Sequence, residues 1–152
     1  MIRKRELRVK EIEENLVKIV EAIEIVENNL SEDFDSFFNS GLIKEGIYKK
    51  IEFAIESIID ICNIINADLR LGMPSFEDNI IDNIDKNKVF DRKIIDLIRE
   101  VKRFRNILVH KYGDIDDKKA FENIHEGLKD FEKIIAEIEK FLEKHRKKKK
   151  NK

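Results

Sequence analysis

Apolar residues recur at helical spacing over most of the chain. No Pro or Gly occurs between residues 3 and 39, so the spacing of three or four positions continues without a break. The pattern predicts a first helix from near Arg3 to Asn29, followed by a loop or short helix in which Ser31 or Asp33 is a candidate N-cap. The apolar positions of this first helix are Leu7, Ile12, Leu16, Ile19, Ile23, Val26 and Leu30.

The same period continues from about Leu42 to Leu71, where isoleucine is the commonest apolar residue. β-Branched side chains also suit strands, but the length of this stretch favours a helix. The segment "GMP" at residues 72–74 is the clearest break in the chain. A short helix is expected after it, over residues 76–84.

Two more helices are predicted in the second half of the chain. Asp91 is expected to open a helix that ends at or just before Gly113, because glycine commonly follows a helix C-terminus. A last helix begins near Asp116 or Asp117 and runs through Leu142. The chain shows no internal repeat and no strand-like alternation. We therefore expect an all-α fold, an antiparallel bundle of four long helices plus a short one.

Charge divides the chain into an acidic body and a basic end. Residues 144–152, "KHRKKKKNK", contain seven Lys or Arg and no acidic residue, whereas residues 1–143 contain 24 basic and 32 acidic residues. We predict one helical domain over residues 1–143 and a basic, disordered tail over residues 144–152. Such a tail either holds nucleic acid by charge alone or is a solvated chain end, which is the commoner case.

The chain has one cysteine and no sequence feature of export. Cys62 stands among apolar neighbours and is expected to be packed and unreactive. Met1 is followed by charged residues rather than by the apolar core of a signal peptide. No apolar run approaches the roughly 20 residues that cross a bilayer. We expect a cytoplasmic protein that does not span a membrane.

Four polar residues stand together in the last turns of the helix expected to begin at Asp91. Within "RFRNILVHKYG", residues 103–113, these are Arg105, Asn106, His110 and Tyr112. At about 100° per residue, Arg105 and Tyr112 lie at the border of the expected core stripe, and Asn106 and His110 lie on the face away from it. The stripe itself consists of Ile94, Leu97, Val101, Phe104 and Leu108.

Apolar residues also lie outside this stripe, at Ile95, Ile98, Ile107 and Val109. A helix that is apolar over most of its circumference is central in its own bundle or buried against a partner. In a small bundle, a second apolar face predicts a dimer. Asn106 and His110 would then face the neighbouring chain.

An arginine and a histidine together suit RNA cleavage without a metal ion. Arg105 offers a planar fork for phosphate, and His110 transfers protons near neutral pH. One imidazole would deprotonate the ribose 2′-hydroxyl, a second group would protonate the leaving 5′ oxygen, and the arginine would stabilise the phosphorane. Because a single histidine is poorly placed for both proton transfers, a two-fold dimer would bring a second copy. The alternative is that these are ordinary surface residues, favoured near a helix C-terminus by the helix dipole.

The other candidate residues have structural explanations. His125 and His145 are expected on the surface of the last helix, and their spacing does not fit metal ligands. No metal or other cofactor is therefore expected. Tyr112 can close its helix by packing its ring. The acidic residues of "GDIDD", residues 113–117, can cap the next helix, repel RNA or help to bind a magnesium nucleotide, and capping is favoured for at least one of them.

A short pattern in the chain identifies a family resemblance. The segment "RNILVHKY" matches the R-x4-H-x-Y pattern of the HEPN superfamily, and the chain resembles HepT toxins, which pair with the nucleotidyltransferase antitoxin MntA. "IYKKIEFAIESIIDICNII" resembles the family's second helix, "LGMP" the following turn, and "DRKIIDLIREVKRFRNILVHKYGDID" the motif helix and its exit. The resemblance covers roughly residues 45–135. The chain carries Arg103-Phe104 where the family often has Gly-Leu, which adds positive charge beside the motif.

The resemblance implies a HEPN-like bundle that acts as a metal-independent endoribonuclease toxin. Arg105 and His110 would be the catalytic residues, Asn106 would orient them or the phosphate, and Tyr112 would accept AMP from the antitoxin. It further implies a homodimer with the motifs facing a cleft, RNA as the substrate and an MntA-like nucleotidyltransferase as the partner. The alternative is a non-catalytic helical HEPN module that serves as partner or substrate-binding subunit of a nucleotidyltransferase.

Overall fold

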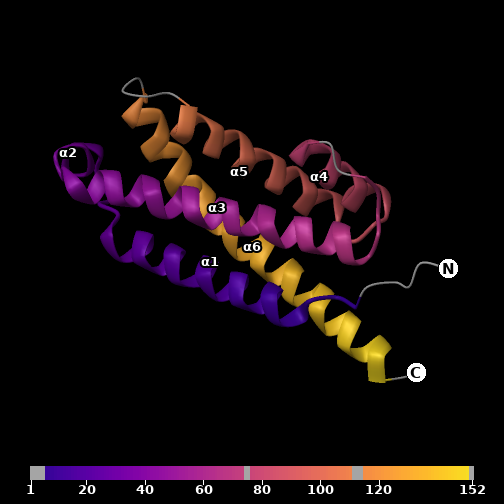
Figure 1. Cartoon of the computed structure of the whole chain (residues 1–152). Helices are drawn as coiled ribbons and strands as arrows, with labels where there is room; N and C mark the ends of the chain where they lie inside the picture. Colours follow the sequence, from indigo (N-terminus) through magenta and orange to yellow (C-terminus); the bar gives the residue numbers. More distant parts are fainter. Residues whose placement is uncertain (1–5, 74–75, 111–114, 151–152) are drawn as a thin grey trace.

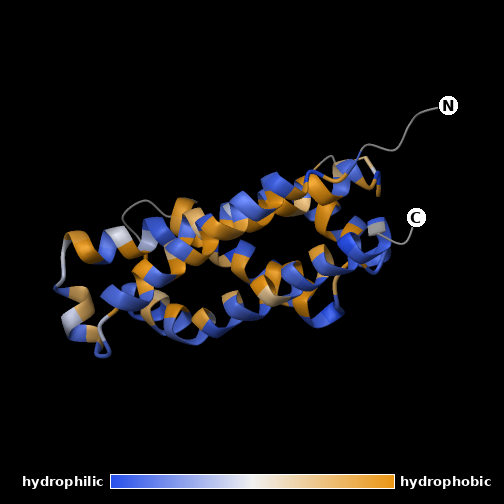
Figure 2. Cartoon of the chain, turned by 90° about the horizontal axis from the view of Figure 1, so that it is seen from below, coloured by the Kyte–Doolittle hydropathy of each residue, from blue (hydrophilic) through white to orange (hydrophobic). Residues whose placement is uncertain are grey.

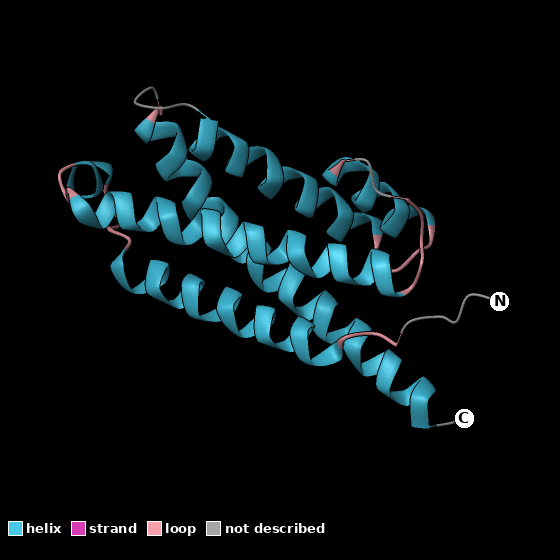
Figure 3. Ribbon diagram, in the orientation of Figure 1, coloured by secondary structure: helices cyan, strands magenta, loops and turns pink. Residues whose placement is uncertain are grey.

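The computed structural model describes residues 6–73, 76–110 and 115–150, and the side chains of His110 and Lys150 are not part of that description. Within these ranges the chain is helical and contains no strand (Figure 3). The all-α prediction is confirmed. The segment after the first helix, which was predicted as a loop or a short helix, forms a short helix, and so does the segment after residues 72–74. The helices are α1 (Val9–Asn29), α2 (Phe34–Phe38), α3 (Leu42–Asp68), α4 (Glu77–Lys86), α5 (Arg92–His110) and α6 (Asp117–Lys150).

The core lies between the four long helices. Helix α1 packs along α3, while α5 and α6 complete the bundle (Figure 1). Hydrophobic and hydrophilic positions alternate along every long helix (Figure 2), and most of the apolar residues are buried between the helices. Burial of these side chains is the main force that holds the bundle together. Fully buried side chains include Phe37, Ile12, Ile19, Ile51, Ile55, Ile58, Ile61, Ile65, Ile84, Ile95, Ile98 and Ile134.

Local hydrogen bonds fix where several helices begin. The Asp33 carboxylate accepts a hydrogen bond from the Ser36 N–H at 2.9 Å, so Asp33 rather than Ser31 is the N-cap of α2. The Asp116 carboxylate likewise accepts a hydrogen bond from the Lys119 N–H at 3.2 Å, at the start of α6. The prediction that an acidic residue of the 113–117 segment caps the last helix is therefore confirmed.

The turn after α3 ties that helix to α4. The Asn66 side chain donates a hydrogen bond to the Gly72 carbonyl at 3.0 Å, and the Asn83 side chain donates to the Asn66 side-chain oxygen at 3.1 Å. Gly72 has a φ of 157°, and a Cβ at this position would lie 2.7 Å from the Asn83 amide nitrogen. A glycine is therefore needed here for both reasons. These contacts hold α4 against the end of α3.

Helix α6 is the longest element and continues into the basic end of the chain. Its 34 residues correspond to a length of about 50 Å. The sequence predicted that the chain leaves the helix after residue 143, whereas α6 continues to Lys150. Lysine and arginine are good helix formers, and no Gly or Pro follows Gly127. An ion pair between Arg146 and Glu13 of α1 also anchors this segment to the bundle.

No helix in the described parts of the chain combines the length and the apolar character that a membrane span requires.

Candidate functional site

The polar motif lies on α5, whose buried face differs from the one predicted. Ile95 and Ile98, which the helical wheel placed outside the core stripe, are completely buried. Of the predicted stripe, Val101 is buried, whereas Ile94, Leu97, Phe104 and Leu108 are only partly buried. The physical reason is that α5 packs against three helices, α3, α4 and α6, so its interior face is wider than the predicted stripe and centred elsewhere. Arg105 therefore points toward a neighbouring helix rather than lying at a solvent border.

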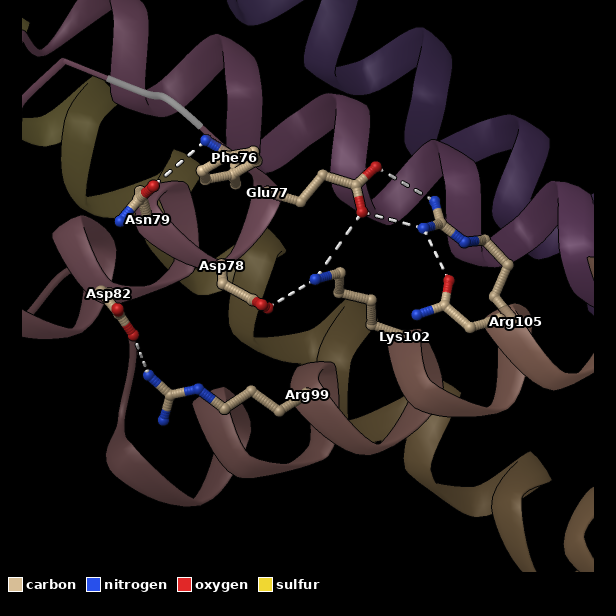
Figure 4. A network of polar contacts seen from close by, with 9 residues as sticks. Phe76, Glu77, Asp78, Asn79, Asp82, Arg99, Lys102 and Arg105 are labelled. Carbon is tan, nitrogen blue, oxygen red and sulfur yellow. Dashed lines mark hydrogen bonds and ion pairs between the residues drawn. The ribbon is translucent and has the colours of Figure 1, made fainter. Parts of the chain in front are cut away.

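Helices α4 and α5 are antiparallel and face each other with opposite charge. The acidic partners all come from α4 and the basic partners all come from α5 (Figure 4). We call this arrangement the α4–α5 ladder. Because successive pairs lie farther along both helices, the ladder sets the register of α4 against α5. Its four ion pairs are Glu77–Arg105, Asp78–Lys102, Asp82–Arg99 and Asp85–Arg92.

Arg105 is held by the ladder's first pair through both ends of its fork. Its Nη1 donates a hydrogen bond to Glu77 Oε1 at 3.2 Å, and its Nη2 donates to Glu77 Oε2 at 2.8 Å. The Arg105 Nη2 also donates to the Asn106 side-chain oxygen at 3.1 Å. The Arg105 side chain is 15% exposed and the Glu77 side chain 37% exposed, so the pair is partly shielded from water. A two-point arginine–carboxylate pair fixes both the position and the plane of the guanidinium.

Lys102 joins the first two pairs of the ladder. Its Nζ lies 3.8 Å from Glu77 Oε2 and donates a hydrogen bond to Asp78 Oδ1. The Lys102 ammonium, through that hydrogen bond and its charge, lowers the pKa of Asp78 below its usual value. The Asp78 carboxylate therefore remains charged near neutral pH. Glu77, Asp78, Lys102 and Arg105 form a cluster of two negative and two positive charges.

The structure brings only part of the predicted motif together. Arg105 and Asn106 are in direct contact, as the assignment of a supporting role to Asn106 requires. Helix α5 ends at His110, but the His110 side chain lies outside the described part of the chain. Tyr112 lies outside the described residues altogether. The roles of all four residues stay predictions.

The segment that follows the motif is anchored to α3. The Asp117 carboxylate accepts hydrogen bonds from the Lys44 ammonium at 3.0 Å and from the Tyr48 hydroxyl at 2.5 Å. Burial raises the pKa of the Tyr48 hydroxyl, and the hydrogen bond to Asp117 raises it further. These contacts hold the start of α6 against the first turns of α3. Asp117 therefore has a structural role close to the motif's exit.

The other chemically notable side chains have packing roles. Cys62 is buried, and burial raises the pKa of its thiol to about 12, so the thiol stays protonated near neutral pH. A ring nitrogen of His125 lies 3.0 Å from the Ser31 carbonyl oxygen, and its ring packs against Phe121. Among residues 6–73, 76–110 and 115–150, no group of three or more His, Cys, Asp or Glu is arranged to hold a metal ion.

The side of α5 away from α4 carries a separate groove. This groove has a volume of about 380 Å³ and lies between α5 and α6. Arg103 and Phe104, the two residues that depart from the family pattern, contribute to its wall together with Ile107. They line the groove beside α6, whereas Arg105 of the same helix turns toward Glu77 of α4, so the contact between Glu77 and Arg105 does not involve them.

Sequence reasoning did not identify Glu77. It is 28 positions away from Arg105, and no periodicity links residues of two different helices. A partial signal exists in the complementary charges, since acidic residues at 77, 78, 82 and 85 stand against basic residues at 92, 99, 102 and 105. Their spacing matches two antiparallel helices, but this can be recognised only once the two helices are known to be neighbours.

Comparisons with known proteins agree on one family. The model of the family "Ribonuclease HepT-like" matches residues 19–138. The mRNA nuclease HepT of Shewanella oneidensis is 24% identical over 106 residues, which cover 70% of this chain and 80% of that protein. The solved structures of similar fold include a tri-AMPylated S. oneidensis HEPN toxin in complex with an MNT antitoxin. That match has 22% identity and a TM-score of 0.76, and covers 85% of this chain and 96% of that one.

A second solved structure has the same fold without a known activity. It is YutE of Bacillus subtilis, a cytosolic protein of unknown function, with 19% identity and a TM-score of 0.76. The match covers 91% of this chain and 93% of YutE. At these identities, the structural matches establish the fold alone.

Proposed function

The chain belongs to the HepT-like ribonuclease family, and on that premise we propose that it is a toxin that cleaves RNA. The observation that carries the proposal is the family match over residues 19–138, which contains the whole of α5. Contact between Arg105 and Asn106 near the end of α5 supports it, because the two side chains offer N–H donors to one phosphate. The resemblance to HepT toxins assigns the catalytic roles to Arg105 and His110.

The proposed reaction needs no metal ion. The ribose 2′-oxygen attacks the adjacent phosphorus while an imidazole takes its proton, and the bond from phosphorus to the 5′ oxygen breaks. The 5′ oxygen receives a proton from a second acid, so the products are a 2′,3′-cyclic phosphate and a free 5′-hydroxyl. The Arg105 guanidinium stabilises the charge that develops on the phosphorane oxygens. His110 of one chain is the base and His110 of a second copy is the acid, which makes a homodimer part of the proposal.

A nucleotidyltransferase of the MNT class is the proposed partner and antitoxin. The support is the S. oneidensis HEPN toxin, which has this fold and is found both AMPylated and in complex with an MNT antitoxin. In this chain the proposed acceptor is Tyr112. Its hydroxyl oxygen would attack the α-phosphorus of ATP, give up its proton and displace pyrophosphate. The product is a tyrosyl-AMP diester that carries a negative charge next to Arg105 and His110 in the sequence and repels RNA.

The test compares the full-length protein with its His110→Ala variant on labelled single-stranded RNA in EDTA. The intact mass of each sample is recorded, because an added adenylate would mark the silenced form. We expect cleavage by the unmodified wild type only, with 2′,3′-cyclic phosphate ends. If unmodified wild type and variant are both inactive, the chain is a non-catalytic HEPN module instead. If both cleave equally, His110 is not the catalytic base. For a sample that carries adenylate, the Tyr112→Phe variant is tested in its place.

A further inference from the structure

We propose that Glu77 is a positioning residue for the RNA-cleaving reaction, which acts by holding the Arg105 guanidinium in a fixed plane beside Asn106. This inference rests on the proposed function and adds a residue that lies outside the Arg–His motif, on a different helix. The contact that carries it is the two-point hydrogen bond of Glu77 with Nη1 and Nη2 of Arg105, at 3.2 and 2.8 Å (Figure 4).

The geometry of the contact decides which part of Arg105 remains open. A guanidinium has five N–H groups. Glu77 takes one from each terminal nitrogen, and Asn106 takes a further one from Nη2. The N–H on Nε shares an edge of the guanidinium with the Nη2 hydrogen that faces Asn106. Among the described residues, the Nε–H of Arg105 has no hydrogen-bond partner, and Glu77 turns it toward Asn106. A phosphate on that side meets donors from both residues without displacing Glu77.

His110 lies along the same side of the helix as Asn106. The two residues are four positions apart, and residues at this spacing are neighbours on a helix surface. A guanidinium turned toward Asn106 is thereby also turned toward the helix face on which position 110 lies. The direction in which Glu77 fixes Arg105 is the direction in which the proposed chemistry takes place.

Glu77 is itself fixed by its place in α4. It is the first residue of this helix, and the positive end of the helix dipole favours a carboxylate there. The Asn79 side-chain oxygen accepts a hydrogen bond from the Phe76 N–H at 3.1 Å, which stabilises this helix start. Buried Ile80, Ile81 and Ile84 hold the helix against the bundle. The carboxylate is thus presented by a rigid element.

The same contact allows the opposite role, in which Glu77 neutralises Arg105 and slows the reaction. Two observations favour positioning. The Lys102 ammonium lies 3.8 Å from Glu77 Oε2 and offsets its negative charge. The carboxylate also occupies the end of the guanidinium and leaves Nε–H open, whereas a blocking group would cover that edge. A long arginine side chain without such a partner would have to be ordered during the reaction, at an entropic cost.

The test is the Glu77→Gln variant of the full chain, with Asp82→Asn as matched control. Glutamine keeps the shape of glutamate but turns an N–H₂ group toward one of the Arg105 nitrogens, so the fork contact is lost. Asp82→Asn removes the same charge from the same helix, where the pair with Arg99 is 2.6 Å long and lies farther from the motif. We expect kcat to fall about 10-fold or more in Glu77→Gln, while KM changes less. The control keeps both within about twofold of wild type, because ion pairs of this kind contribute little individually.

A second measurement reads the position of Arg105 without any catalysis. In ¹⁵N-resolved NMR spectra, slow rotation of a guanidinium separates the Nη1 and Nη2 signals, and the Arg105→Lys variant identifies which signals belong to Arg105. We expect separate Arg105 signals in wild type and in Asp82→Asn, and merged signals in Glu77→Gln. Thermal unfolding of each variant shows that the fold is retained.

The outcomes separate this inference from the proposed function. If wild type cleaves RNA, His110→Ala does not, and Glu77→Gln cleaves as fast as Asp82→Asn, the role of Glu77 is overturned and the function stands. Faster cleavage by Glu77→Gln overturns it as well, and shows that the pair restrains the enzyme. Unchanged Arg105 signals in Glu77→Gln overturn the positioning argument directly. An inactive wild type with unmodified Tyr112 overturns the function and this role together.

Discussion

The Tyr48 hydroxyl gives a stability contribution that should disappear at high pH. It donates a hydrogen bond to Asp117 Oδ1 at 2.5 Å, and only 9% of the residue is exposed. Its ring also packs edge-on against Phe37, with 5.8 Å between the ring centroids. The Tyr48→Phe substitution removes the hydroxyl and keeps the ring. Asp117 still pairs with Lys44 in the variant, so the change isolates one hydrogen bond.

The size of the effect near pH 8 follows from the charge of the acceptor. A hydrogen bond to a charged group contributes about 1.5–3 kcal/mol. Because Asp117 keeps its ion pair with Lys44 and 19% of its side chain remains exposed, we place the loss at the lower end. We expect the free energy of unfolding of Tyr48→Phe to be about 1.5 kcal/mol below that of wild type.

The pH dependence has a definite sign. Burial and Asp117 raise the pKa of Tyr48 in the folded chain, whereas in the unfolded chain tyrosine ionises near its ordinary pKa of about 10. The hydroxyl's contribution is therefore complete below about pH 10 and decreases above it, because only the unfolded chain loses the proton. At pH 11 ionisation of Tyr48 stabilises the unfolded wild type by about 1.4 kcal/mol and lowers the free energy of unfolding by the same amount. The variant cannot gain it at this position.

Urea unfolding followed by circular dichroism at pH 8, 10 and 11 measures the difference between wild type and Tyr48→Phe. Ionisation of groups remote from Tyr48 and Asp117 occurs in both proteins and cancels in the difference. We expect the gap of about 1.5 kcal/mol at pH 8 to approach zero at pH 11. A gap that stays constant over this range would show that the Tyr48 hydroxyl ionises as easily in the folded chain, and would refute the reasoning.

Two further predictions concern the core. Ile98→Ala should lower the free energy of unfolding by about 2–5 kcal/mol because it leaves a cavity, whereas Ile107→Ala on the same helix should cost clearly less, since Ile98 is fully buried and Ile107 is 39% exposed. Urea unfolding of both variants measures this, and equal losses would contradict the assigned orientation of α5. Cys62 should stay unmodified by iodoacetamide at pH 8 in the folded protein and react after unfolding in guanidinium, because it is buried and its thiol has a pKa of about 12. Intact mass measures the labelling, and rapid labelling of the folded protein would contradict the packing of α3.

The orientation of α5 shows where sequence reasoning succeeds and where it stops. The period of apolar residues located this helix to within a few positions of its ends, since helical spacing is a local property of the chain. It did not identify the buried side. Apolar residues lie around most of the circumference of this helix, so helical spacing alone is compatible with more than one buried face. Packing of α5 against α3, α4 and α6 selected the side with Ile95 and Ile98, and that choice is made between helices.

The basic end of the chain shows a related limit. Residues 144–152 carry no apolar residue to pack, which predicted a disordered tail. The helix nevertheless continues to Lys150. The residues of this segment have good helix propensity, and Arg146 pairs with Glu13 of α1. The prediction considered burial alone, whereas a helix that has already formed can be extended by residues of good propensity at little cost.

The sequence by itself determined the all-helical class, the approximate helix bounds and the family, and it predicts Arg105, Asn106, His110 and Tyr112 as the motif residues. These depend on local periodicity and on residue identity at fixed spacing, and both can be read along one chain. Only the tertiary structure decided that Arg105 turns inward and meets Glu77. That contact depends on the register of α4 against α5, which the ion pairs of the α4–α5 ladder set as a group. Such a register is a property of two surfaces in contact, and no pattern within either helix specifies it.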